Sequence, residues 1–155
     1  DVRQLLVRCG KTPVVVQKDR PGQLGNRLQM ALYREAISIV EQGIASAEDV
    51  DRCIKTGFGL RLPVYGVFEH MDMVGLDLVK SIYDYTLPDL ESRQSTPAVL
   101  DRHVAAGELG VKTGRGFYDW SVHDATAVRA RRDRFVRDFV RQRPVTGARD
   151  RSSSS

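Results

Sequence analysis

The stretch RPGQLGNRLQMAL, residues 20–32, decides how the rest of the chain is interpreted. It opens with Pro21 and Gly22, which are typical of turns, and continues into apolar residues at helical spacing until Gly43 ends the run. Asn26 stands near the start of this helix, where an asparagine oxygen most often accepts an unpaired backbone N–H. The stretch therefore predicts a turn that opens onto a long amphipathic helix, with Asn26 either capping the helix or facing a substrate.

Downstream of this helix the pattern stays helical. Ser46 is an expected N-cap, and Asp49 three residues later resembles the second half of a capping box. Thr96 is the N-cap expected for a later helix, with Pro97 at its first position. Gly75 marks an expected bend between two helices. The further helical regions that we expect are residues 46–54, 63–87, 97–106 and 124–141.

Upstream of residue 20 the pattern is different. Residues 1–9 suit a short amphipathic helix, and Gly10 is a typical helix stop. The β-branched run TPVVVQ, residues 12–17, predicts a strand. Because one strand cannot form a stable sheet alone, this opening is expected to be the edge of some larger sheet.

The composition is that of a soluble globular domain, since 41% of the 155 residues are apolar and 28% are charged. No apolar run reaches the roughly 20 residues of a membrane helix, and no secretory signal opens the chain. Cys9 and Cys53 match no metal or redox spacing, so free, partly buried thiols in a reducing compartment are expected. These features predict a cytoplasmic protein with no membrane partner.

The net charge of +4 is unevenly distributed along the sequence. Between Arg129 and Arg151 nine arginines stand against three aspartates, so the remaining residues carry a net charge of −2. An arginine-rich helix could contact nucleic acid or acidic lipid. These arginines, however, alternate with an apolar stripe and with Asp133 and Asp138. We therefore expect the solvated outer face of a docked helix, and no nucleic-acid partner.

The motifs do not support a self-contained cofactor, metal or nucleophile site. The G-x-G pieces at residues 57–59 and 114–116 lack both a third glycine and a convincing preceding strand, so no complete dinucleotide-binding fold is expected in this chain. No G-x-S-x-G motif indicates a nucleophilic serine. No metal is expected, because no histidine has a second ligand at zinc spacing. The histidines are His70, His103 and His123.

Several motifs nevertheless occur in a familiar order. Residues 10–79, which include PGQLGNR and GFGLRLPVYGVFEHMDMVGLDLV, and residues 107–120, GELGVKTGRGFYDW, resemble the carboxyl-terminal part of the 3-hydroxyacyl-CoA dehydrogenase family. The likeness covers residues 1–140 and is shared with the related lambda-crystallin or gulonate dehydrogenase branch. Two departures stand out: Gln23 replaces the family's usual phenylalanine, and GVFEHMD differs from the commoner G-P-[FL]-E pattern.

The resemblance implies a mainly α fold. The chain would be a helical C-terminal domain of the 6-phosphogluconate-dehydrogenase-like type, preceded by a remnant helix and strand of a Rossmann-like domain. Residues 1–19 would then be the last helix and strand of an NAD-binding domain, residues 20–142 the helical domain, and residues 143–155 a disordered tail. A homodimer is implied as well, and the apolar faces of residues 28–40 and 64–83 exceed what one small helical core needs.

The same resemblance gives roles to two residues that, taken alone, would most often cap a helix or face solvent. Asn26 matches the family's active-site asparagine, which hydrogen-bonds the substrate and helps to orient the catalytic histidine. Lys112 matches a lysine that reaches the bound NAD. The family's histidine base, its glutamate partner and its glycine-rich loop have no counterpart here, so NAD would be bound mainly by a domain outside this chain.

Three functions remain open at this point. The leading one is the substrate-binding and dimerisation portion of an NAD-dependent 3-hydroxyacyl-CoA dehydrogenase of fatty acid metabolism, which oxidises 3-hydroxyacyl-CoA to 3-oxoacyl-CoA. Such a portion is expected to be inactive without the Rossmann domain, and its partners would be an acyl-CoA, a second copy and a separate NAD-binding domain. The alternatives are a stand-alone helical binding or dimerisation module without catalysis, and a fragment of a gulonate-type sugar-acid dehydrogenase.

Overall fold

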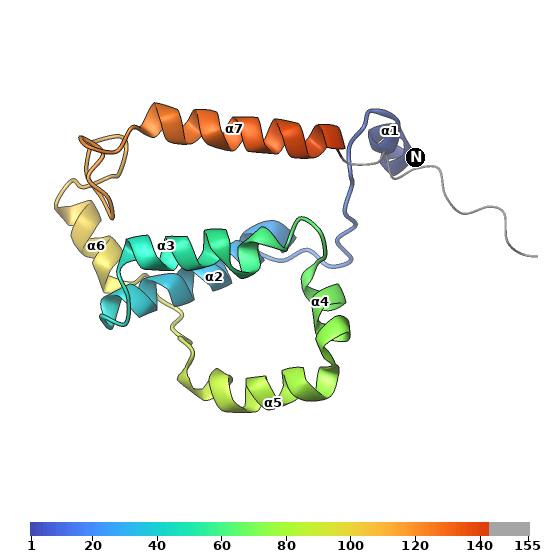
Figure 1. The fold of residues 1–155 in the computed structure, drawn as a ribbon, viewed down its shortest axis with the longest axis horizontal. Coiled ribbons are helices and arrows are strands. Elements are labelled where there is room, and N and C mark those ends of the chain that lie inside the picture. The colour runs from blue at the N-terminus through green and yellow to red at the C-terminus, as the bar shows by residue number, and fades with distance from the viewer. Residues whose placement is uncertain (143–155) are drawn as a thin grey trace, which may run out of the picture. The chain divides into compact units, whose positions relative to one another are not determined.

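The computed structural model describes residues 1–142, and these residues are mainly helical, as the sequence predicts (Figure 1). The tail expected in residues 143–155 lies outside the described residues. Within them two isolated β-bridges occur, Gly110 with Arg115 and Arg115 with Asp119, and no strand is formed. The elements are α1 (Val2–Arg8), α2 (Gln23–Glu41), α3 (Ala47–Thr56), η1 (Phe58–Leu60), α4 (Val67–Val74), α5 (Leu76–Thr86), η2 (Leu87–Asp89), α6 (Ala98–Ala105) and α7 (Ala125–Gln142).

The strand predicted for residues 12–17 does not form in this structure. A β-strand is held by the hydrogen bonds of a neighbouring strand, and the described part of the chain offers no such neighbour. The helix stop predicted at Gly10 is confirmed. Helix α1 ends at Arg8, Gly10 adopts a φ of +69°, and its N–H donates to the Val7 carbonyl over 2.9 Å. It stays a prediction that residues 1–19 are the last helix and strand of an NAD-binding domain.

The chain folds as two compact units. Of the described residues, 24–109 form one unit, and 1–23 together with 110–142 form the other. The first unit contains most of α2 and every element from α3 to α6. The second contains α1, the glycine-rich segment that follows Leu109, and α7.

Helix α2 begins earlier than Asn26, so the prediction that Asn26 caps it is wrong. The helix starts at Gln23, whose φ of +48° lies in the left-handed region and whose N–H donates to the Arg20 carbonyl over 3.1 Å. At the other end, Gly43 at φ +69° stops the helix, as predicted, and its N–H donates to the Val40 carbonyl over 3.1 Å. Asn26 therefore lies within the first turn, and its side chain is not used as the N-cap.

Local signals define α3 and the pair α4–α5. The Ser46 hydroxyl accepts from the N–H of Asp49 over 3.1 Å, which is the predicted cap, and Gly57 ends α3. The same hydroxyl also donates to the Asp49 carboxylate over 2.8 Å. Gly75, with φ +102°, separates α4 from α5 as expected. Only a residue without a Cβ adopts this backbone conformation readily.

Helix α6 begins differently from the prediction. It starts at Ala98 with Pro97 as the N-cap residue, so neither Thr96 nor Pro97 has the place that the sequence pattern gave it. The side-chain oxygen expected from Thr96 is supplied from another helix, because the Glu41 carboxylate of α2 accepts the N–H of Val99 over 2.8 Å. A carboxylate at a helix N-terminus satisfies an unpaired donor and interacts favourably with the helix dipole.

A polar cluster ties the segment before α6 to α2. We call it the α2 clamp, and it consists of Glu35, Ser38, Glu41, Glu91 and Arg93. The Arg93 guanidinium pairs with Glu41 over 2.7 Å and with Glu91 over 2.6 Å. The Ser38 hydroxyl donates to Glu91 over 3.2 Å, and the Glu35 carboxylate accepts the N–H of Glu91 over 2.8 Å. The clamp thus joins residues more than 50 positions apart in the sequence.

Two carboxylates of the clamp have lowered pKa values. Hydrogen bonds from Arg93 hold the pKa of Glu91 at about 2. The N–H of Val99 is the main cause that lowers the pKa of Glu41, with Arg93 next among the groups that lower it. Ser38 is the one buried residue in the described part of the chain, with 1% of its surface exposed. Both carboxylates are therefore held as anions over the ordinary pH range.

Apolar side chains, in contrast, remain uncovered. No apolar side chain is buried among residues 1–142, although an ordinary domain of this length buries a core. In residues 24–109 the exposed apolar side chains include Val64, Phe68 and Tyr85, which are 81%, 80% and 88% exposed. None of the described helices combines the length and the apolar character needed to span a membrane.

Candidate active site

The unit of residues 24–109 contains a hollow of about 780 Å³. Its walls come from the first turns of α2, from η1 and the turn that follows it, and from the start of α4. Most of the lining side chains are apolar. The lining residues are Gly25, Asn26, Leu28, Gln29, Leu32, Phe58, Arg61, Leu62, Tyr65, Val67, His70 and Met71.

Asn26 lies on the wall that α2 provides. Gln29, Leu32 and Asn26 are three residues apart along this helix, so they share one face, and all three line the hollow. Gly25 adds no side chain here, and a Cβ built on it meets no atom within 4 Å. The sequence prediction that Asn26 faces a substrate site is therefore compatible with its position, because its amide is exposed at a hollow and stands on a helix.

Two glycines allow the opposite wall to form. A Cβ on Gly57 would lie 2.5 Å from the Cys53 carbonyl oxygen, and a Cβ on Gly59 would lie 2.5 Å from the Ile54 carbonyl oxygen. The G-x-G piece at residues 57–59 therefore lets η1 pack directly against the end of α3. This is a structural role, and it agrees with the sequence argument against a nucleotide-binding loop at this point.

The turn after η1 carries the polar groups of this wall. The carbonyl of Arg61 accepts the N–H of Val64 over 2.9 Å and that of Tyr65 over 3.2 Å. The Tyr65 ring in turn stacks on the His70 ring, with the centroids 5.3 Å apart and the planes within 4° of parallel. Glu69 is used locally, because its carboxylate accepts the N–H of Gly66 over 2.7 Å. Arg61, Tyr65 and His70 thus border the hollow from one short segment.

Lys112 lies in the other unit, in the turn formed by residues 111–114. The Gly110 N–H donates to the Arg115 carbonyl over 2.7 Å and closes this turn, and Lys112 is exposed within it. The following segment is fixed by Asp119, whose carboxylate accepts the hydroxyl of Ser121 over 2.5 Å, and this bond lowers the pKa of Asp119. The exposed cation can meet an anionic group. Its role toward NAD stays a prediction.

The other histidines have local contacts. His103 Nδ1 lies 2.7 Å from a Glu108 carboxylate oxygen, and the His123 ring meets the Tyr118 ring edge-on with the centroids 5.2 Å apart. In the part of the chain that the structure describes, no three His, Cys, Asp or Glu side chains are grouped as metal ligands. Cys9 and Cys53 are free thiols, and both are exposed instead of partly buried as expected.

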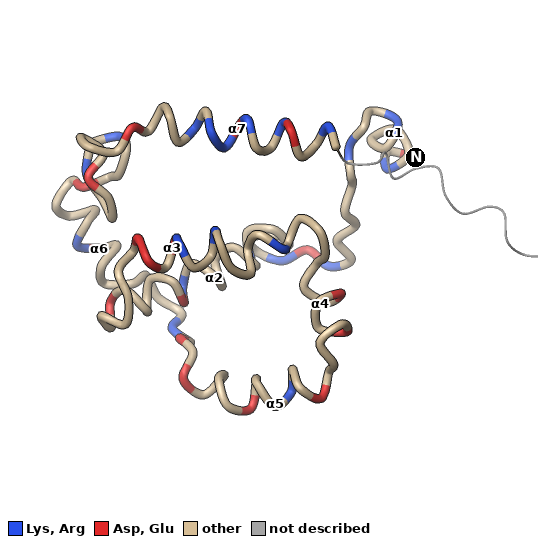
Figure 2. Tube along the Cα trace, in the orientation of Figure 1, with Lys and Arg blue, Asp and Glu red and all other residues tan. Residues whose placement is uncertain are grey.

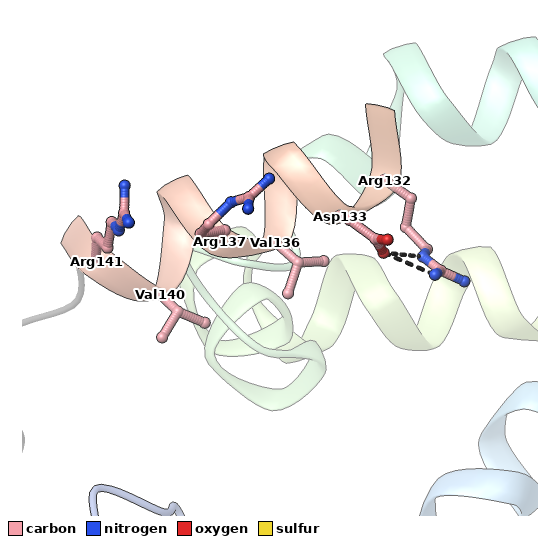
Figure 3. Close-up of a pocket in the computed structure, with 6 residues that line it drawn as sticks. All are labelled: Arg132, Asp133, Val136, Arg137, Val140 and Arg141. Atoms are coloured by element: carbon pink, nitrogen blue, oxygen red, sulfur yellow. Dashed lines mark hydrogen bonds and ion pairs between the residues drawn. The ribbon is translucent and has the colours of Figure 1, made fainter. Parts of the chain in front are cut away.

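The arginines of α7 are spread along the helix with acidic residues among them (Figure 2). A second, shallower hollow runs along this helix, and all six of its lining residues come from α7 itself (Figure 3). Val136 and Val140 point to one side there, while Arg137 and Arg141 point to the other. Arg132 is paired with its neighbour Asp133 over 2.7 Å. This arrangement suits a helix with one apolar and one solvated face, as the sequence pattern indicates.

Comparison with known proteins identifies the family of this chain. The sequence profile described as "3-hydroxyacyl-CoA dehydrogenase, C-terminal domain" matches residues 22–120, which include both Asn26 and Lys112. The chain belongs to the 3-hydroxyacyl-CoA dehydrogenase family. It corresponds to the C-terminal domain of that family, in agreement with the resemblance of its motifs.

The curated relatives include a pyridine carboxylate dehydrogenase and a hydroxyacyl-coenzyme A dehydrogenase. The chain is 36% identical over 133 residues to the 5-formyl-3-hydroxy-2-methylpyridine 4-carboxylate 5-dehydrogenase of Mesorhizobium japonicum, an alignment that covers 86% of the chain and 43% of the relative. It is 43% identical over 114 residues to the human mitochondrial hydroxyacyl-coenzyme A dehydrogenase, covering 72% of the chain and 35% of the relative. The chain thus spans about two fifths of the length of these relatives.

A solved structure has the same fold. The crystal structure of 5-formyl-3-hydroxy-2-methylpyridine 4-carboxylic acid 5-dehydrogenase, described as an NAD⁺-dependent dismutase, superposes with a TM-score of 0.85 at 35% identity. The superposition covers 92% of this chain and 47% of that one. Of the residues that line the hollow, sequence reasoning singled out Asn26 but not Arg61 or Tyr65. The signal was one arginine within the otherwise apolar run GLRLPV.

Proposed function

We propose that this chain is the substrate-binding and dimerisation portion of an NAD-dependent dehydrogenase, with 3-hydroxyacyl-CoA as its first candidate substrate. Oxidation of that substrate to 3-oxoacyl-CoA would belong to fatty acid metabolism. The observation that carries the proposal is the place of Asn26, whose exposed amide lines a hollow from within the first turn of a long helix. Membership of the family supports this role for the amide.

Asn26 would act by hydrogen bonding to the reacting oxygen of the substrate. A neutral amide can accept a hydrogen bond from a hydroxyl and donate one to a carbonyl, so it can hold both the substrate and the product. Its position on α2 fixes it better than a loop would. The general base and its partner are expected on another domain, so Asn26 assists the reaction and does not start it.

NAD would accept the hydride when bound. Residues 1–142 contain no strand, glycine-rich loop and helix in sequence, so they do not fit the main dinucleotide site. An exposed lysine in a tight turn does fit an outer contact with an anionic dinucleotide, and Lys112 is such a residue. We therefore assign to this chain one cation near NAD and leave the binding loop to a separate domain or subunit.

Homodimerisation is the second part of the proposal. Exposed apolar side chains on α2 and α5 support it, such as Leu28 at 63% and Ile82 at 52%. Exposed apolar side chains that form a large patch usually mark an interface. Light scattering at high protein concentration tests this part, and a strictly monomeric chain would contradict it.

A second candidate substrate is a small carboxylic acid. The observation that favours it is Arg61, a cation in the lining of the same hollow. The Mesorhizobium relative is named for a pyridine carboxylate, and the sugar acid of the gulonate branch is also a carboxylate. A helical module that has lost catalysis is the third alternative, and it predicts no activity in any assembly.

The deciding experiment measures NADH formation by the whole enzyme, meaning this chain together with an NAD-binding domain. Asn26→Ala is expected to lower kcat/KM for 3-hydroxybutyryl-CoA about 10²- to 10³-fold, which is typical for the loss of one donor to a reacting oxygen. Gln94→Ala, which removes an exposed amide outside the hollow, serves as the matched control. The 155-residue chain alone should produce no NADH. Unchanged activity in the Asn26 variant would refute the role of this amide.

A further inference from the structure

Helix α7 is strongly basic and lies beyond the stretch that the family profile matches. Its 18 residues hold six arginines and two aspartates, which gives a net charge of +4 (Figure 2). The profile ends at residue 120, so its description does not extend to this helix. Across residues 1–142, no ion pair engages Arg134, Arg137 or Arg141. These three arginines follow one another at intervals of three and four residues, so they share one face of the helix.

Another side of α7 is apolar and uncovered. Phe135, Val136 and Val140 are 56%, 51% and 60% exposed. Figure 3 shows Val136 and Val140 on one side of the helix and Arg137 and Arg141 on the other. An amphipathic helix normally packs its apolar stripe against a partner surface. Since these apolar side chains are open to solvent in the described structure of one chain, the partner surface must be sought outside it.

The segment from α4 to η2, residues 67–89, has the opposite charge. It holds five acidic residues and one lysine, which gives a net charge of −4. Asp72, Asp77 and Asp89 are exposed, and none of them takes part in an ion pair within the part of the chain that the structure describes. The unpaired carboxylates of this acidic segment therefore equal in number the unpaired arginines on one face of α7.

The acidic segment also has an uncovered apolar face. Leu78, Ile82 and Tyr85 of α5 are four and three residues apart, so they share one face of the helix. They are 51%, 52% and 88% exposed. Both surfaces thus combine exposed apolar side chains with unpaired charges, and the charges are opposite in sign. An arginine can lay its alkyl stem along apolar surface while its charged head reaches a carboxylate beside it.

We propose that α7 of one copy of this chain docks on the acidic segment of a second copy, and that the second copy returns the same contact. This inference rests on the proposed homodimerisation and names the two surfaces that would form it. A two-fold dimer makes each contact twice, and opposite charges across it fix the register of the two helices. An acidic membrane would cover the apolar face of α7 alone, whereas a second copy covers that face and the face of α5 together.

Charge reversal in the full 155-residue chain tests the proposal, with sedimentation equilibrium as the measurement of the dimer dissociation constant. Arg134→Glu combined with Arg137→Glu should raise this Kd roughly tenfold to a hundredfold, because repulsion replaces attraction at each contact. Asp72→Lys combined with Asp77→Lys should raise it by a similar factor. An equimolar mixture of the two double variants should dimerise with nearly the wild-type Kd, because reversed charges then meet reversed charges across the heterodimer.

Arg52→Glu combined with Lys55→Glu is the matched control, since it changes the net charge equally at two exposed positions of α3. It should leave the Kd unchanged, and circular dichroism should show equal helix content in all variants. An unchanged Kd in the arginine double variant would overturn the proposal. So would a mixture that stays monomeric, which would mean that α7 binds within its own chain.

A membrane is the other partner that the experiment can detect. If wild-type chain sediments with phosphatidylglycerol vesicles, and the arginine double variant does not sediment with them but keeps the wild-type dimer Kd, the proposal is overturned in favour of a lipid surface. A wild-type chain that is strictly monomeric would refute the proposed homodimerisation itself. A dimeric wild type whose Kd ignores all of these reversals would leave homodimerisation standing and refute only the role of α7.

Discussion

Replacing Gly59 with alanine tests how the wall of the hollow is built. A Cβ at this position would lie 2.5 Å from the Ile54 carbonyl oxygen and 3.1 Å from Ile54 Cγ2, whereas real Cβ atoms essentially never approach below 3.0 Å. Because the obstructing oxygen is backbone, η1 must move away from the end of α3. Overpacking of this kind typically costs about 1–3 kcal/mol. In a chain of this size each kcal/mol lowers Tm by about 2–4 °C.

The matched control is the same substitution at Gly25. There a Cβ meets nothing within 4 Å, and the residue lies inside α2 with no left-handed backbone angle. Removing a helical glycine is expected to stabilise the chain by about 0.5–1 kcal/mol. Thermal unfolding followed by far-UV circular dichroism should therefore give opposite shifts for Gly59→Ala and Gly25→Ala. Equal shifts, or a Gly59→Ala variant as stable as the wild type, would show that the contact between η1 and α3 is not formed as described.

Two further predictions concern the α2 clamp. The pKa of Glu91 is about 2 in the folded chain, below the value of 4.5 that is ordinary for a glutamate, so the stabilisation from this carboxylate is complete above pH 4.5 and is lost as the pH falls toward 2. Urea midpoints measured across this range should fall with pH, and Glu91→Gln should flatten the dependence. Glu41→Gln should make the Val99 amide exchange faster with solvent, because the hydrogen bond loses its charge and Arg93 loses a partner. Amide exchange by NMR checks this, with the exposed Glu48→Gln as control, and unchanged protection at Val99 would contradict it.

Local signals in the sequence predict most of the helices correctly. Gly43 and Gly75 interrupt the helical pattern where the chain needs positive φ angles. The Ser46 hydroxyl caps α3 by accepting the N–H of Asp49, so both partners lie within four consecutive residues of the sequence. Apolar spacing predicts α2 and α7 within a few residues of their observed bounds. These features depend on neighbours in the sequence, which is why sequence reasoning recovers them.

The errors have a different physical origin. Thr96 loses the capping role because Glu41, far away in the sequence, supplies a carboxylate to α6. The strand at residues 12–17 needs a pairing partner that the described residues do not provide. The place of Arg61 in the lining of the hollow was not predicted, because the turn after η1 has no periodicity and several segments of the chain build the hollow. Tertiary contacts decided each of these cases, and a single sequence does not display them.

The spacing of the α2 clamp has a consequence for how the gene can vary. Glu35, Ser38 and Glu41 follow one another at intervals of three, so they project from one side of α2 toward the same partner segment. A codon inserted between Ser38 and Glu41 would rotate Glu41 by roughly 100° about the helix axis. It would uncouple the carboxylate from both Arg93 and α6. Length changes among descendants of this gene should therefore accumulate in the irregular turn between η1 and α4, where one more residue alters the shape of the ligand hollow and leaves the scaffold in register.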